Sequence, residues 1–125
     1  MLEGRTPVRK RRVIAMDGLV RALAQRCRAF EESGDANLVL EESAASQARQ
    51  LGELIVSVGP GAGQVEVAAH VALGWLHWCR FQVLPEDANQ ADLAAALRYY
   101  SAIAQVAPYM IPEPVFQRLT QQKKK

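Results

Sequence analysis

The stretch Val67-Ala-Ala-His-Val-Ala-Leu-Gly-Trp-Leu-His-Trp-Cys-Arg-Phe81 decides how this chain folds. We expect it to form a helix from about residue 64 to 84, because the breaker Gly59-Pro60-Gly61-Ala62-Gly63 precedes it and Leu84-Pro85 follows it. This helix would be apolar almost all round, which is typical of a helix contacted on several sides in the middle of a domain. Its polar residues make it unsuited to lipid; they are Glu66, His70, His77 and Arg80.

Size and composition indicate one folded helical domain. The chain has 125 residues, of which 50% are hydrophobic and 22% charged, as is ordinary for a folded domain. Aromatic residues make up only 6% and alanine is abundant, which favours helices packed at close range. Two cysteines cannot form a disulfide framework, and the sequence has neither a membrane-spanning apolar run nor an apolar signal core. We therefore expect a cytoplasmic protein.

Apolar residues recur at helical spacing on both sides of the central stretch. The first stripe predicts a helix from about residue 7 or 8 to 32, ended by Gly34; its members are Met16, Val20, Leu23, Cys27 and Phe30. The same spacing predicts helices over about 36–58 and 90–107, and prolines open a short last helix over about 114–122. We expect an all-α fold of antiparallel helical hairpins, with two helix-turn-helix repeats and a short C-terminal helix. The single domain would cover 1–125, with flexible ends at 1–7 and 120–125.

An internal repeat supports this organisation. Cys27-Arg28-Ala29-Phe30 precedes the acidic turn at Asp35, and Cys79-Arg80-Phe81 precedes the acidic turn at Asp87. Cys27 and Cys79 are 52 residues apart, and so are Asp35 and Asp87. Each unit is therefore a helix, an acidic turn and a second helix, and stacking of the two units would supply the core. The repeated cysteines fit buried core positions better than a nucleophile or a redox pair.

The repeat resembles a known class of helical repeat. Leu19-x-x-x-Leu23-x-x-x-Cys27-Arg-Ala-Phe-Glu-Glu-Ser-Gly-Asp35-x-x-Leu38 resembles the turn between helices in tetratricopeptide-like repeats of bacterial regulatory proteins. The stretch from His70 to Glu86, followed by Asp92-Leu93, resembles the last such repeat ahead of a CHAT (caspase-like) domain. The resemblance covers about residues 15 to 115, although 52 residues exceed the standard 34-residue unit. The chain ends where a catalytic domain would begin, so the resemblance carries no protease activity over.

Charge is segregated along the chain. Residues 3–28 contain eight basic and two acidic residues, residues 31–92 two basic and ten acidic, and residues 93–125 five basic and one acidic. The densest cluster is Arg9, Lys10, Arg11 and Arg12, which suggests nucleic-acid binding or assembly as an alternative function. A solvated helix face is the other interpretation, and no aromatic stacking residues accompany the cluster. Because two repeats are few for a free-standing stack, we also expect a homodimer.

Catalytic and metal-binding patterns are missing from the sequence. His70 and His77 are seven residues apart, whereas zinc ligands in standard sites are two to five apart. We expect each histidine to bond a neighbouring carboxylate or carbonyl instead. The glycine-rich segment 59–63 lacks the Lys-Ser or Lys-Thr that a phosphate loop requires. We therefore expect no enzyme activity, no metal and no cofactor.

The expected function is that of a non-enzymatic protein–protein interaction module or scaffold. Stacked antiparallel helices form a concave face that holds a peptide or a partner helix. The resemblance implies that the first helix of each pair lines this face, and we assign that role to the helices at 36–58 and 90–107. Solvated surface is the alternative for the candidate partner-binding residues, which are Glu42, Ser46, Arg49, Glu53, Arg98, Ser101 and Gln105.

Overall fold

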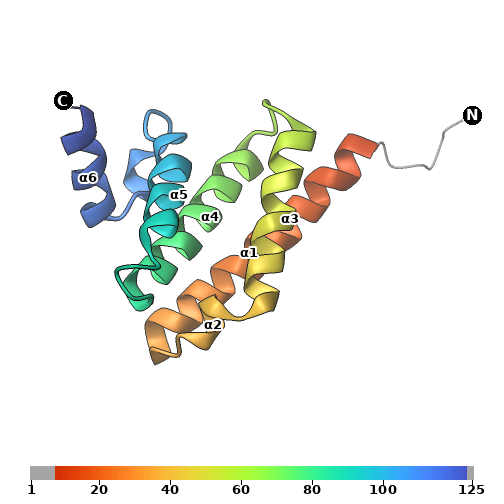
Figure 1. Cartoon of the computed structure of the whole chain (residues 1–125). Coiled ribbons are helices and arrows are strands. Elements are labelled where there is room, and N and C mark those ends of the chain that lie inside the picture. The colour runs from red at the N-terminus through yellow and green to blue at the C-terminus, as the bar shows by residue number, and fades with distance from the viewer. Residues whose placement is uncertain (1–7, 124–125) are drawn as a thin grey trace, which may run out of the picture.

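The computed structural model describes residues 8–123, which form helices and turns without a strand. The elements are α1 (Val8–Ser33), α2 (Asn37–Leu40), α3 (Glu42–Val58), α4 (Gln64–Val83), α5 (Gln90–Ser101), a 3₁₀ turn η1 (Pro108–Met110) and α6 (Glu113–Lys123). The chain reverses direction between consecutive long helices (Figure 1). The expected all-α fold is thus confirmed. None of the described helices is long and apolar enough to cross a membrane.

Helix α4 lies in the middle of the fold, as its apolar sequence predicts. It contacts α1, α2 and α3 on one side and α5 on the other (Figure 1). One core cluster joins α1, α2, α3 and α4, and contains Leu23, Leu51 and Leu73. A second cluster joins Trp78 of α4 to α5 and α6, and contains Tyr100 and Val115. Because α4 supplies residues to both clusters, it is buried on several sides and needs almost no polar face.

The helix expected over 36–58 is interrupted at Glu41, which the periodicity did not predict. Glu41 has an extended backbone (φ −69°, ψ 157°), so that α2 ends at Leu40 and α3 begins at Glu42. The cause is Arg26 of α1, whose guanidinium donates to the Leu38 carbonyl at 3.2 Å and to the Ser43 hydroxyl at 2.8 Å, and also pairs with the Glu41 carboxylate. This pairing holds the pKa of Glu41 below its ordinary value. A contact from another helix thus sets the break.

The helix expected over 90–107 stops at Ser101, six residues early. Beyond it the amides of Ile103, Ala104 and Val106 bond to carbonyls three residues back, which tightens the chain into successive turns. Pro108 disfavours the α conformation at Ala107 before it, whose backbone is at φ −143°, ψ 55°. The tighter path buries Ile103 and Ala107 in the second core cluster.

The C-terminal part also differs in detail from expectation. The 3₁₀ turn η1 is not among the predicted elements, while α6 covers the expected last helix and extends to Lys123. Residues 1–7 and 124–125 lie outside the described part of the chain. At the other end of the first repeat, Gly34 has the left-handed conformation (φ +76°) expected of a residue that ends a helix.

The two cysteines of the internal repeat lie in the first core cluster. Cys27 of α1 and Cys79 of α4 are both fully buried and free. The hydrogen bond to Cys79 and burial raise the pKa of the Cys27 thiol far above its ordinary value. This confirms the expectation that the cysteines are buried, reduced packing residues.

A close approach of two helices occurs at Gly74. A Cβ atom added to Gly74 would lie 2.8 Å from two ring carbons of Tyr100, which is closer than real side chains come. Tyr100 is itself buried in the second core cluster, so its ring has little freedom to move away. The glycine therefore allows α5 to pack directly on the backbone of α4.

The buried cysteines should resist labelling. We expect both thiols to react slowly with a thiol reagent in the native protein, because a buried thiol of raised pKa offers little accessible thiolate. In denaturant both should react at the rate of a model thiol. Fast native labelling of both residues would contradict their placement in the core.

Gly74→Ala should destabilise the protein by about 1–3 kcal/mol through overpacking against Tyr100. The matched control is Gly18→Ala on α1, where an added Cβ meets no atom within 4 Å. The control should be more stable than the wild type by about 0.5–1 kcal/mol, since alanine is the better helix former. Urea unfolding followed by circular dichroism measures both; a stabilised Gly74→Ala variant would exclude the close packing.

Candidate functional site

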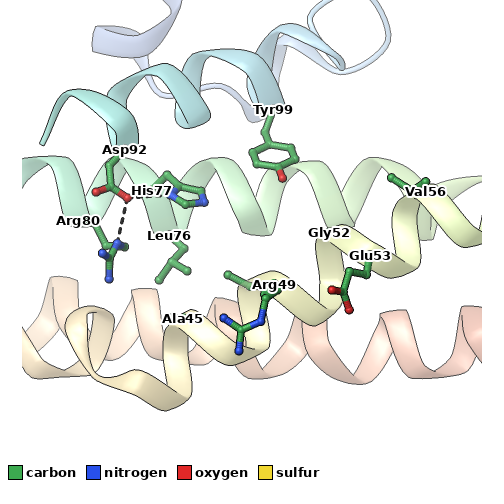
Figure 2. A pocket seen from close by; sticks show the side chains of 11 residues that line it. Ala45, Arg49, Gly52, Glu53, Val56, Leu76, His77, Arg80, Asp92 and Tyr99 are labelled. Carbon is green, nitrogen blue, oxygen red and sulfur yellow. Dashed lines mark hydrogen bonds and ion pairs between the residues drawn. The ribbon is translucent and has the colours of Figure 1, made fainter.

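A groove of about 600 Å³ lies between α3 and α5, with α4 as its floor. Figure 2 shows α5 on one side, α3 on the other and the side chains of α4 between them. We call this hollow the α3–α5 groove. Its volume is in the usual range of ligand-binding clefts.

Half of the residues on the α3 wall are small. They recur every three or four positions and so share one face of the helix. Arg49 and Glu53 are exposed on this wall, and Val56 is 82% exposed at its end. The six wall residues are Ala45, Ala48, Arg49, Gly52, Glu53 and Val56.

The floor contains a buried carboxylate held by two donors. Asp92 of α5 is only 7% exposed, and its Oδ1 lies 2.8 Å from His77 Nδ1 and 2.9 Å from Arg80 Nε. Arg80 also donates to the Val39 carbonyl of α2 at 3.0 Å. The cluster therefore joins α2, α4 and α5. Figure 2 shows Asp92, His77 and Arg80 together at one end of the groove. These contacts supply the pairing that a buried carboxylate requires.

Burial lowers the pKa of His77, an effect that the hydrogen bond to Asp92 opposes and that Arg80 and Arg98 reinforce. The ring is therefore neutral near pH 7. Because the Asp92 carboxylate is an acceptor, Nδ1 carries the proton and Nε2 is left as an acceptor. The His77 side chain is 23% exposed and lines the groove.

Tyr99 reaches across the groove from α5 to α3 (Figure 2). A Cβ atom added to Gly52 of α3 would lie 3.5 Å from the Tyr99 hydroxyl. The Tyr99 ring is parallel to His77 within 11°, with centroids 6.0 Å apart, and the Arg98 guanidinium lies 5.0 Å from the Tyr99 centroid. The two walls are therefore one tyrosine side chain apart at this point.

The predicted contact residues divide into two groups. Arg49 and Glu53 line the groove, whereas Arg98 is outside its lining and stacks on the lining residue Tyr99. The rest are outside its lining: Ser46 accepts a hydrogen bond from Gln50 at 3.1 Å, and Glu42, Ser101 and Gln105 are exposed elsewhere.

Sequence reasoning missed the polar cluster on the floor. The 3.6-residue period of α4 does place His77 and Arg80 on one face, and a histidine bonded to a carboxylate or carbonyl was expected. Both histidines confirm that expectation, since His70 Nδ1 lies 2.8 Å from the Glu66 carbonyl and His77 bonds Asp92. No signal in the sequence connected Asp92 or Tyr99 to them, because their contact depends on how α5 packs.

The basic cluster of the alternative hypothesis lies in the first turns of α1. Arg9, Lys10, Arg11 and Arg12 are exposed. Arg9 donates to the carbonyls of Val58 at 3.4 Å and Pro60 at 3.3 Å, so it closes the C-terminal end of α3. Among residues 8–123, no three histidine, cysteine, aspartate or glutamate side chains are placed to hold a metal ion.

Comparison of the chain with protein-family models, with curated proteins and with solved structures found no match. The resemblance to tetratricopeptide-like repeats therefore stays a prediction. The candidate site is defined by its geometry alone.

The lowered pKa of His77 predicts a pH-dependent stability. In the unfolded chain His77 has its ordinary pKa of 6.5, so the unfolded state binds more protons than the folded state below about pH 6.5. The free energy of unfolding should therefore fall as the pH is lowered from 7 to 5. His77→Gln should show a smaller fall over this range in urea titrations. An equal fall in both proteins would contradict the assignment.

Proposed function

We propose that the chain is a non-enzymatic protein-interaction module that binds an extended peptide segment of a partner protein in the α3–α5 groove. The observation that carries the proposal is the open groove itself, which has three small residues and Arg49 on its α3 wall, while Arg98 of α5 stacks on the lining residue Tyr99. The resemblance to tetratricopeptide-like repeats, which hold peptides on a concave helical face, agrees with it.

The width of the groove favours an extended peptide over a partner helix. Tyr99 of α5 comes within contact of Gly52 of α3, so one side chain spans the space between the walls. A helix with its side chains is about 10–12 Å wide, whereas an extended chain can lie over Tyr99 between the walls. The small residues Ala45, Ala48 and Gly52 let a peptide backbone come close to α3.

The charges of the groove favour an acidic peptide. Arg80 and Asp92 bond each other, which leaves Arg49 and Glu53 as the other charged residues of the lining. Arg98 is outside the lining and stacks on Tyr99. Arg49 is on the α3 wall, and the Arg98 guanidinium of α5 lies 5.0 Å from the Tyr99 centroid, so a carboxylate beside Tyr99 would have both arginines as neighbours. Guanidinium and carboxylate groups form strong charge-assisted hydrogen bonds. His77 Nε2 adds an acceptor for a peptide N–H.

The polar groups of the floor suit recognition better than catalysis. His77 Nδ1, Arg80 and Asp92 are all engaged in mutual hydrogen bonds that fix the floor. A fixed floor reduces the entropy lost when a peptide binds.

Selection from a random library of twelve-residue peptides tests the proposal. We expect enriched peptides to contain acidic residues, and their affinity to fall at least about tenfold for Arg49→Glu, since a charge-assisted hydrogen bond contributes about 1.5–3 kcal/mol. Val56→Glu should also weaken binding. Fluorescence anisotropy of labelled peptides measures both effects.

Matched controls lie on α1, outside the groove. Arg28→Glu replaces another exposed arginine, and Ile14→Glu replaces another exposed aliphatic residue. Both should bind the selected peptides within about twofold of the wild type. If the library yields no peptide, or if the groove variants bind as well as the controls, the proposal is wrong.

A further inference from the structure

A second hollow, of about 770 Å³, lies at the N-terminal end of α4. Its walls are the loop at Gly61 and Gly63 on one side and the turns after α5 on the other, and Val67 and His70 of α4 form its floor. Val106 is 71% exposed and Tyr109 is 83% exposed at its rim, with Met110 beside them. Large apolar side chains gathered at a hollow are typical of an interaction surface.

The second hollow continues the line of the α3–α5 groove. Glu66 and His70 in the second hollow, and His77 and Arg80 in the groove, are four, seven and three residues apart, so they share one face of α4. The two walls of the α3–α5 groove also continue into the walls of the second hollow. The α3 wall leads into the loop after Val58, and the α5 wall leads into the turns after Ser101.

Tyr99 lies at the junction of the two hollows. Its ring centroid is 6.0 Å from that of His70 and 6.0 Å from that of His77. One aromatic ring therefore has the histidine of each hollow as a neighbour. A chain lying over Tyr99 would pass directly from one hollow into the other.

The two hollows differ in chemistry. The groove has Arg49 on its α3 wall and Arg98 stacked on Tyr99, whereas the rim of the second hollow carries Val106, Tyr109 and Met110. From Glu66 to Arg80 the face of α4 is about 21 Å long at 1.5 Å per helical residue. An extended peptide covers that length with about six or seven residues.

We infer that the two hollows form one binding site for an extended peptide segment with an acidic part over Arg49 and Arg98 and a bulky apolar residue against Val106 and Tyr109. The inference rests on the proposed function and adds the sequence pattern of the partner. His77 and the second hollow are about 10–15 Å apart along α4, so the acidic and apolar residues should be about three to five positions apart.

The same twelve-residue library tests this pattern. We expect the enriched peptides to share an acidic residue and a leucine, phenylalanine or tryptophan three to five positions apart, in one constant order. Val106→Glu and Tyr109→Ala should each weaken binding at least about fivefold. Ile14→Glu and Phe116→Ala are the matched controls, since both replace exposed apolar residues outside the two hollows, and should leave affinity unchanged.

Three other results of these experiments would overturn the inference. Peptides that depend on Arg49 but tolerate Val106→Glu and Tyr109→Ala would overturn the inference and leave the proposed function standing. A library without groove-dependent peptides would overturn both. A second copy of the chain could also occupy the apolar hollow; a wild-type mass twice 13.8 kDa in sedimentation, halved by Tyr109→Ala, would overturn the peptide assignment.

Discussion

The close packing of Tyr100 on Gly74 is the contact on which the arrangement of the helices depends. The absence of a side chain at Gly74 lets the ring of Tyr100 lie against the backbone of α4. This contact fixes the distance and rotation of α5 relative to α4, because a buried ring in a packed core has few alternative positions. On its opposite side α4 packs against α1, where Cys79 contacts Cys27.

The candidate site follows from the same contact. Successive residues on a helix point about 100° apart, so fixing Tyr100 in the core directs Tyr99 away from it and toward α3. Asp92, two turns earlier on α5, is brought over His77 and Arg80. The groove and its polar floor are therefore a consequence of how α5 packs. A change at Gly74 would disturb them without touching any groove residue.

Two arginines show how polar contacts secure the short helix α2. Arg26 of α1 donates to the Leu38 carbonyl, and Arg80 of α4 donates to the Val39 carbonyl. A four-residue helix has no internal donors for its last carbonyls, so the two arginines supply the hydrogen-bond donors for Leu38 and Val39. They also explain why the chain breaks at Glu41, where the carboxylate completes the pairing of Arg26. Both arginines act across long stretches of sequence.

The sequence by itself determined the helical class, the central position of α4, and the burial of Cys27 and Cys79. These features depend on local periodicity, on glycine and proline and on the number of apolar residues per turn, all of which a single helix displays. The assignment of Arg49, Glu53 and Arg98 to partner binding, made from helix position alone, stays a prediction. Only the tertiary structure decided the break at Glu41, the early end of α5 and the polar cluster of His77, Arg80 and Asp92. The break and the cluster each depend on a group from another helix, Arg26 for the break and Asp92 for the cluster, and no pattern within one segment encodes the distance to a group on a different one. The early end of α5 follows from the tight turns before Pro108, which bury Ile103 and Ala107 in the second core cluster.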